Sequence, residues 1–301
     1  MTGKVYFGND EKQVWINAPQ TGMRASSAGY IFEQQLLSGS TFIKRSDASH
    51  RRFEMSWLGP LNAPNLEDSL SVIKNFSDGL YGTSKLFWND PYATTSNLFS
   101  PAWAAPFMSI GTDWDAICPD DVGITKEVVT TASISSLVGN NTQGYPSQSA
   151  KFTAPGNPNA ESDKFTFYVP SGYTLWLGLH GHHGTTGAAF GKAYKNGVAA
   201  TPTNITPLGV NTATRVNTGF SSTVADKVEF YLAKIAPSPC TFHISGLIAQ
   251  LLPNGTTPQA GDFIAGRGTT GLQFASFPEI EYYSANVNDG QIGMSATFAE
   301  A

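Results

Sequence analysis

The sequence predicts a mainly β protein with one α-helix, and three observations support this fold class. Charged residues make up 14% of the 301 residues, against about 25% in an average soluble protein. Short apolar–polar alternations are separated by turn-forming clusters at 140–144, 154–163, 252–261 and 286–290. Only one segment has helical periodicity. Many short strands joined by turns are therefore expected.

The clearest strand is predicted at 51–59, with the sequence RRFEMSWLG. Phe53, Met55 and Trp57 alternate with polar Glu54 and Ser56, the two-residue period of a half-buried strand. Residues 164–172 and 228–235 are further strand candidates.

The helix is expected to start at Asn65, which can cap it, with acidic residues in the first turn. Gly79 supplies a C-terminal stop. The apolar residues at helical spacing are Leu66, Leu70, Ile73, Phe76 and Leu80.

Composition changes near residue 120 and predicts two domains. Aromatic residues and prolines cluster at 86–107, whereas short strands and turns dominate beyond 124. We expect one domain over 1–124, with strands and the helix, and a second over 125–301. The second is predicted to be an all-β sandwich of roughly eight strands.

Bulk properties give no support to several functions. The net charge of −5 does not favour nucleic-acid binding through a basic surface. No apolar run is long enough to span a bilayer, and the first ten residues lack the apolar core of a secretory signal. No known catalytic motif occurs. We expect neither an enzyme nor a bound cofactor.

Residues 174–187, TLWLGLHGHHGTTG, contain three of the five histidines. On a strand, Leu175, Leu177 and Leu179 would face the core. Trp176, His180 and His182 would then share the exposed face, followed by His183.

Three interpretations of this face remain open. Two imidazoles could share a zinc ion, although a third ligand is missing at any diagnostic spacing. Trp176 and the histidines could contact a sugar. The strand could instead run into a surface turn, which the usual abundance of polar residues in loops favours.

Two pairs of nearby carboxylates are candidate catalytic groups: Glu279 with Glu281, and Asp113 with Asp115. Neighbouring carboxylates on one strand face are more typical of a solvated edge, because glycosidases place the pair on different elements. Trp88, Trp103 and Trp114 are expected to pack rather than to form ligand platforms. No catalytic residue and no metal site is predicted.

The chain resembles the distal tail proteins, or minor tail proteins, of long non-contractile-tailed bacteriophages. The resemblance rests on 51–59, on NLEDSLSVIKNFSDG (65–79) and on the aromatic segment from 85 to 106, ending in SIGTDWDAICP. The second half is similar to the sandwich domain of such proteins from actinobacteriophages, through FTFYVPSGYTLWLGLHG (165–181) and the terminal GQIGMSATFAEA.

This resemblance implies an N-terminal β-sandwich or barrel-like domain with one α-helix, followed by a galectin-like or carbohydrate-module-like β-sandwich. It implies a homohexameric ring that joins the tail tube to the baseplate hub and other minor tail proteins. The expected location is the distal end of the virion tail, after synthesis in the host cytoplasm without a signal peptide. The alternative function is adsorption to host cell-surface polysaccharide, with Trp176, His180, His182 and His183 as contact residues.

Overall fold

The structure is a computed structural model of the chain. It describes residues 3–19, 24–28, 31–35, 41–45, 50–90, 97–104, 110–111, 113–114, 124–130, 148–154, 161–183, 191–205, 214–233, 240–258, 268–283 and 290–300. No helix in these ranges is long and apolar enough to cross a membrane.

The chain forms two compact units. Unit 1 combines Met1–Tyr92 with Gly271–Ala301, and unit 2 is the intervening Ala93–Thr270. Each unit has its own cluster of buried apolar side chains, and neither cluster contains a residue of the other unit. Unit 2 is therefore an insertion within unit 1.

Unit 1 contains an eight-stranded antiparallel sheet in the order β2-β1-β7-β17-β19-β6-β3, with β18 also paired to β19. Its strands are β1 (Lys4–Gly8), β2 (Gln13–Asn17), β3 (Arg24–Ala28), β6 (His50–Pro60), β7 (Leu86–Asn89), β17 (Thr269–Phe274), β18 (Ile280–Tyr282) and β19 (Gln291–Glu300). The strands β4 (Ile31–Gln35) and β5 (Thr41–Arg45) form a separate hairpin.

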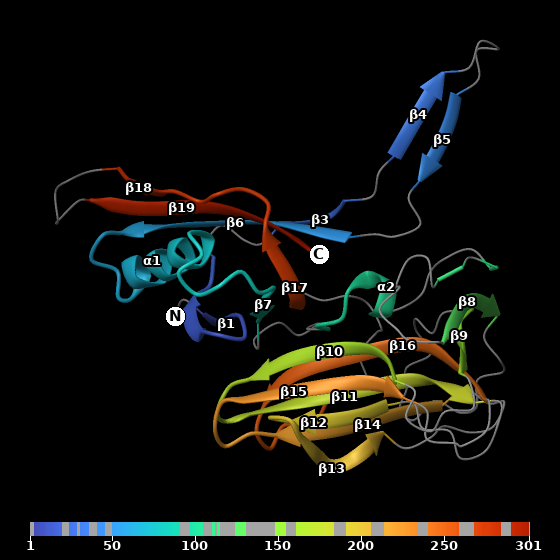
Figure 1. Cartoon of the computed structure of the whole chain (residues 1–301). Helices are drawn as coiled ribbons and strands as arrows, with labels where there is room; N and C mark the ends of the chain where they lie inside the picture. Colours follow the sequence, from blue (N-terminus) through green and yellow to red (C-terminus); the bar gives the residue numbers. More distant parts are fainter. Residues whose placement is uncertain are drawn as a thin grey trace. The chain divides into compact units, whose positions relative to one another are not determined.

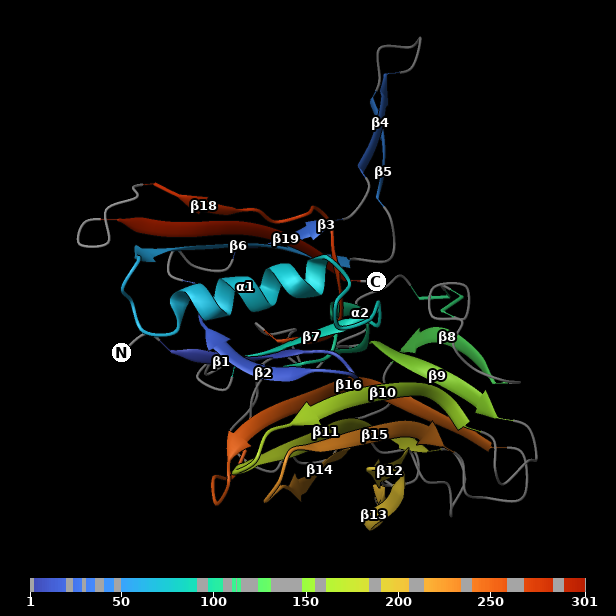
Figure 2. The same cartoon turned by 60° about the vertical axis from the view of Figure 1, so that its left-hand side comes forward.

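Helix α1 (Leu66–Ser77) lies between the β1–β2 and β6–β19 parts of this sheet (Figures 1 and 2). Its predicted apolar stripe is buried from Leu66 to Phe76 and packs with Phe53, Met55 and Trp57 of β6. The alternation predicted for this strand is thereby confirmed.

The ends of α1 differ in part from the prediction. Asn65 precedes the helix with φ 60°, and its side chain makes no capping hydrogen bond. At the other end, Gly79 (φ 77°) supplies the predicted stop. The Gly79 amide donates to Phe76 O and the Leu80 amide to Asn75 O, which is the Schellman arrangement. Leu80 therefore lies beyond the helix, and its side chain is exposed rather than in the stripe.

Unit 2 is a sandwich of two antiparallel sheets, ordered β10-β15-β12-β13 and β14-β11-β16-β9-β8. The strands are β8 (Thr125–Thr130), β9 (Gln148–Ala154), β10 (Glu161–Val169), β11 (Tyr173–His183), β12 (Gly191–Lys195), β13 (Val198–Ile205), β14 (Thr214–Ser221), β15 (Asp226–Ala233) and β16 (Cys240–Pro253). The prediction of a mainly β protein with one helix and a sandwich is confirmed; the only other described helix is the four-residue α2 (Pro101–Ala104).

The division into units differs from the boundary expected at residue 124. The last strand, β19, pairs along β6 from Gln291↔Pro60 to Ala299↔Arg52, so the chain's final segment belongs with its first. Composition could not reveal this, because strand pairing over such a distance in sequence leaves no local signal.

The aromatic segment before 124 packs onto unit 2. The ring centroids of Phe99 and Phe165 are 4.9 Å apart, and those of Trp103 and Trp114 are 4.6 Å apart. Trp114 is fully buried. Trp88 is also buried, in the core of unit 1. The expectation that these tryptophans pack is confirmed.

Candidate functional site

Strand β11, which carries the histidines, lies between β14 and β16 in the five-stranded sheet. Leu175, Leu177 and Leu179 are buried in the sandwich core, as their alternation predicts. A register shift between His180 and Gly181 interrupts the pairing with β16. At Gly181 a Cβ atom would lie 2.0 Å from the carbonyl oxygen of His243, so only glycine fits this close approach of two backbones.

The predicted exposure of the histidine face is wrong. The exposed fraction is 0% for His180 and 4% for His182, while Trp176 is half-buried. The Trp176 indole N–H donates to Thr256 O over 3.1 Å. The side chain of His183 lies outside the described residues. Alternation correctly predicts that these side chains point away from the sandwich core. It does not predict their exposure, because the outer face of the sheet can also be buried.

A polar row runs across four strands of this face. His182 pairs with His243, His243 with Lys151, and Lys151 with Glu127. The rings of His182 and His243 stack with centroids 4.2 Å apart and planes 10° apart. Burial, followed by the nearby His182 and Lys151, lowers the pKa of His243 to about 4.

Metal binding by this row finds no support in the geometry. Among the described residues, no three His, Cys, Asp or Glu side chains lie together as a metal site would need. The near-parallel stack of His182 and His243 is a ring-to-ring contact.

Three of the four residues in the two carboxylate pairs are described, and all three are exposed. Glu279 and Glu281 are exposed, and Glu281 accepts a hydrogen bond from the Tyr283 hydroxyl. Asp113 is exposed and forms an isolated bridge with Glu127. Asp115 lies outside the described residues. Asp113, Glu279 and Glu281 therefore occupy solvated positions, as expected.

A second surface of unit 2 was not predicted. It is the outer side of the four-stranded sheet, and we call it the tyrosine–lysine face. Its residues are Lys164, Thr166, Tyr168, Lys192, Tyr194, Lys227, Glu229 and Tyr231, from β10, β12 and β15. Their sequence neighbours Phe165, Phe167, Ala193, Val228 and Phe230 point into the core.

Two tyrosines form the centre of this face. Tyr194 and Tyr231 meet edge to face, with ring centroids 5.5 Å apart and planes 84° apart. Both are half-buried. Lys164 Nζ lies 5.9 Å from the centre of the Tyr231 ring. Tyr168 lies further along β10 and is 7% exposed. The alternation of outward polar and inward apolar residues in the two predicted strands was the signal that could have located this face.

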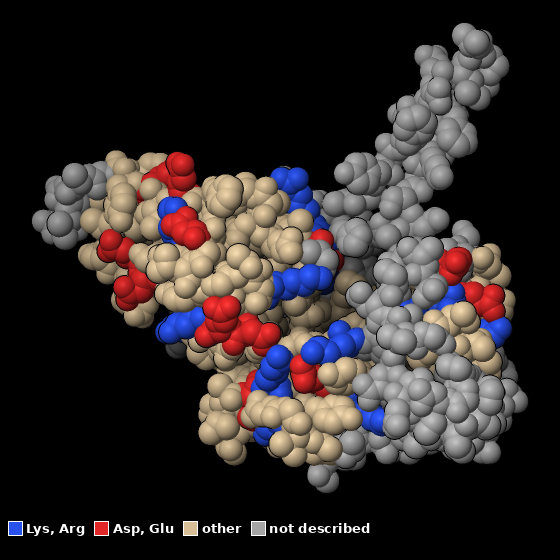
Figure 3. Space-filling model, viewed as in Figure 1, with Lys and Arg blue, Asp and Glu red and all other residues tan. Residues whose placement is uncertain are grey.

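Charged groups surround the tyrosines. Lys164 Nζ lies 2.8 Å and Lys227 Nζ 3.5 Å from Glu229 Oε1. The hydrogen bond from Lys164 lowers the pKa of Glu229, and the same bond raises the pKa of Lys164. In Figure 3, basic and acidic side chains are interspersed over the region of β10 and β15.

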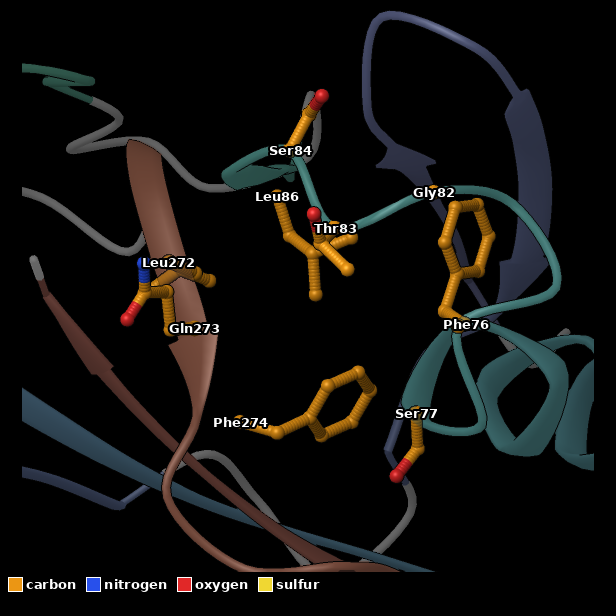
Figure 4. Close-up of a pocket in the computed structure, with 10 residues that line it drawn as sticks. Phe76, Ser77, Gly82, Thr83, Ser84, Leu86, Leu272, Gln273 and Phe274 are labelled. Carbon is orange, nitrogen blue, oxygen red and sulfur yellow. The ribbon is translucent and has the colours of Figure 1, made fainter.

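Unit 1 contains a small cavity of about 210 Å³ between the end of α1, the segment that follows it and β17 (Figure 4). Phe76, Leu86, Leu272 and Phe274 supply apolar walls, and the remaining lining is polar or glycine. Its volume is below the roughly 300–1,000 Å³ of typical small-molecule sites, so we assign no ligand to it.

Two solved structures are similar to part of the chain. A carbohydrate-binding module of family 35 from Cellvibrio japonicus Abf62 is similar over 44% of this chain and 91% of its own, with 15% identity and a TM-score of 0.26. A family 4 carbohydrate-binding module matches 50% of this chain and 92% of its own, with 10% identity and a TM-score of 0.23. No protein-family model and no curated protein matches the sequence.

Proposed function

We propose that this protein is a structural component of a bacteriophage tail tip, which assembles into a homohexameric ring between the tail tube and the baseplate hub. The observation that carries the proposal is the β4–β5 hairpin. Its strands pair with each other from Ile31↔Arg45 to Gln35↔Thr41 and with no other described strand. An isolated two-stranded hairpin is marginally stable in water, so a partner surface is expected to support it.

Other features of unit 1 support assembly. Strands β2 and β3 end the described sheet, with pairing on one side only, and such edges can add a strand from another chain. Unit 1 also carries five of the eight large apolar side chains that are exposed among the described residues: Leu58, Leu80, Phe277, Tyr282 and Tyr283. Exposed aromatic residues favour an interface.

The chain order is consistent with separate tasks for the two units. Unit 2 is inserted between β7 and β17, which are neighbours in the sheet of unit 1. An insertion between adjacent strands leaves the surrounding sheet continuous. Unit 1 can therefore form the contacts that close a ring. Unit 2 is not needed for those contacts and can have a separate function.

Assembly is tested by the mass and shape of the purified protein. We expect light scattering to give the mass of six chains and negative-stain images to show rings with a central hole. Replacing residues 31–45 with a short Gly–Ser linker should give monomers with an unchanged circular dichroism spectrum. A control replaces the exposed turn residues 223–225 of unit 2 in the same way and should keep the ring. A monodisperse monomer of the complete chain at all concentrations would contradict the proposal.

Carbohydrate binding by unit 2 is the second candidate function. The tyrosine–lysine face favours it, because the half-buried Tyr194 and Tyr231 lie beside hydrogen-bonding side chains on an accessible sheet surface. Sugar rings pack their C–H faces on aromatic rings and hydrogen-bond through their hydroxyls. Retention on a panel of immobilised polysaccharides tests it, and Tyr194→Ala with Tyr231→Ala should abolish the retention. A complete chain that is retained by no polysaccharide would remove this candidate and leave the assembly proposal intact.

A further inference from the structure

One row of the tyrosine–lysine face carries polar groups beside the aromatic centre. Thr166 pairs with Glu229 and Glu229 pairs with Tyr194, so these three residues are neighbours across β10, β15 and β12. Directly opposite residues on one face of a sheet have Cβ atoms about 4.5–5.5 Å apart. Tyr231 lies two residues after Glu229 on β15 and therefore on the same face. A carboxylate-bearing residue thus neighbours both tyrosines.

The Glu229 carboxylate is held through one of its two oxygens. Lys164 Nζ lies 2.8 Å and Lys227 Nζ 3.5 Å from Oε1. The hydrogen bond from Lys164 lowers the pKa of Glu229, so the group is ionised at neutral pH and can only accept hydrogen bonds. Among the described residues, none donates a hydrogen bond to Oε2, and this oxygen is not fully buried. Oε2 is therefore a positioned acceptor that a ligand can reach.

Two hydroxyl groups accompany this acceptor. Thr166 and Tyr194 are half-buried, and in the described parts of the chain their hydroxyls have no hydrogen-bond partner. A hydroxyl can both donate and accept. The row therefore offers one acceptor and two groups of either kind, beside rings on which a sugar can pack. The hydroxyl groups of a sugar match this combination, because each of them can also donate and accept.

We propose that the row of Thr166, Glu229 and Tyr194 selects polysaccharides with unsubstituted hydroxyl groups, and that Glu229 Oε2 accepts a hydrogen bond from one of them. This inference rests on the second candidate function and names its ligand class. Acetylation or methylation of that hydroxyl removes its proton, so that an ester or ether oxygen would face the carboxylate as a second acceptor. An acceptor left without a donor weakens binding. Selection therefore depends on one hydrogen bond and not on the net charge of the face.

Affinity electrophoresis of the complete chain tests the proposal. The probes are dextran, galactomannan and galactan, each unsubstituted and after partial O-acetylation. We expect at least one unsubstituted polymer to retard the protein, and its acetylated form to bind about tenfold more weakly, because a hydrogen bond to a charged group is lost. Glu229→Gln should weaken binding of the unsubstituted polymer about tenfold. The same variant should also remove most of the difference between the two forms of the polymer.

Glu127→Gln is the matched control. Glu127 also pairs with a lysine, Lys151, at 2.5 Å, but it lies on the other sheet of unit 2, so this variant should leave retardation unchanged. Thermal melting checks that both variants are folded. The comparison of the two polymer forms with the unaltered chain needs no variant, so it decides the matter even if Glu229→Gln does not fold.

The outcomes separate this inference from the function on which it rests. Equal retardation of the unaltered chain by both forms of a polymer would overturn the selection for free hydroxyls, while carbohydrate binding stands. A Glu229→Gln variant that binds both forms more weakly by the same factor would overturn the role of Glu229 in the same way. No retardation by any unsubstituted polymer would overturn the second candidate function together with this inference.

Discussion

His182 and His243 stack face to face across β11 and β16, with ring centroids 4.2 Å apart. The pair lies on the face of the five-stranded sheet that points away from the sandwich core. Burial keeps His243 neutral, and its pKa falls from 6.5 to about 4. Protonation of His243 would place a charge in a largely buried position.

The stack predicts that acid destabilises the fold. Between pH 6.5 and about 4 the unfolded chain protonates His243 whereas the folded chain does not, so the free energy of unfolding rises with pH across this window. After allowance for solvent screening, we expect a loss of about 1–2 kcal/mol on going from pH 7 to pH 4. Urea unfolding at several pH values measures it. His243→Phe keeps a stacked ring without the titration and should lose less stability; an equal loss would contradict the prediction.

The buried ion pair between Arg51 and Glu300 gives a second prediction. Their side chains are 8% and 5% exposed, and the Arg51 amide and Nε each donate to the Glu300 carboxylate over 2.9 Å. Arg51→Ala leaves a buried carboxylate, and we expect it to lower the free energy of unfolding by about 3–5 kcal/mol. The double variant Arg51→Met with Glu300→Leu should recover a large part of this loss. Urea denaturation of the single and double variants checks both statements, and a double variant as unstable as the single one would refute the second.

Two glycines of unit 1 predict unequal costs of substitution by alanine. At Gly79 (φ 77°) a Cβ atom meets nothing within 4 Å, so Gly79→Ala should lower the free energy of unfolding by only about 1–2 kcal/mol, because alanine must adopt the left-handed backbone conformation there. At Gly8 (φ 150°) a Cβ atom would lie 2.0 Å from Lys12 O. Gly8→Ala should therefore lower the free energy of unfolding by about 3 kcal/mol or more. Thermal melting ranks the two variants, and equal melting temperatures would count against the close approach of the Gly8 and Lys12 backbones.

The separate cores predict that residues 93–270 fold without unit 1. Every member of their buried cluster lies within this range, from Leu98 to Leu251, and compact inserted domains commonly fold alone. We expect the isolated fragment to give a β-type circular dichroism spectrum and one cooperative melting transition. A fragment that aggregates or melts gradually would show that unit 2 needs unit 1.

Local periodicity was sufficient to predict several elements. The alternation of Phe53, Met55 and Trp57 gave a strand and its buried side, and the spacing from Leu66 to Phe76 gave the helix. Both patterns depend only on neighbouring residues, because a strand repeats every two residues and a helix every 3.6. The same reasoning found the core side of β11.

The predictions were wrong where contacts between distant segments of the chain determine a domain boundary or the burial of a side chain. The boundary at 124 was misplaced because β19 returns to pair with β6. His180 and His182 were expected to be exposed, yet both are buried. The tyrosine–lysine face was missed because its residues come from three strands that only the sheet brings together.

Local patterns in the sequence were enough to specify the mainly β class, the single long helix and the inward side of the clearest strands. The insertion of unit 2 and the burial of His180 and His182 became known from the three-dimensional structure. Burial of one side of an element is encoded in its own period, whereas strand partners and the covering of a second face depend on long-range contacts. His180 and His182 of β11 are buried, and the candidate ligand surface lies on the other sheet.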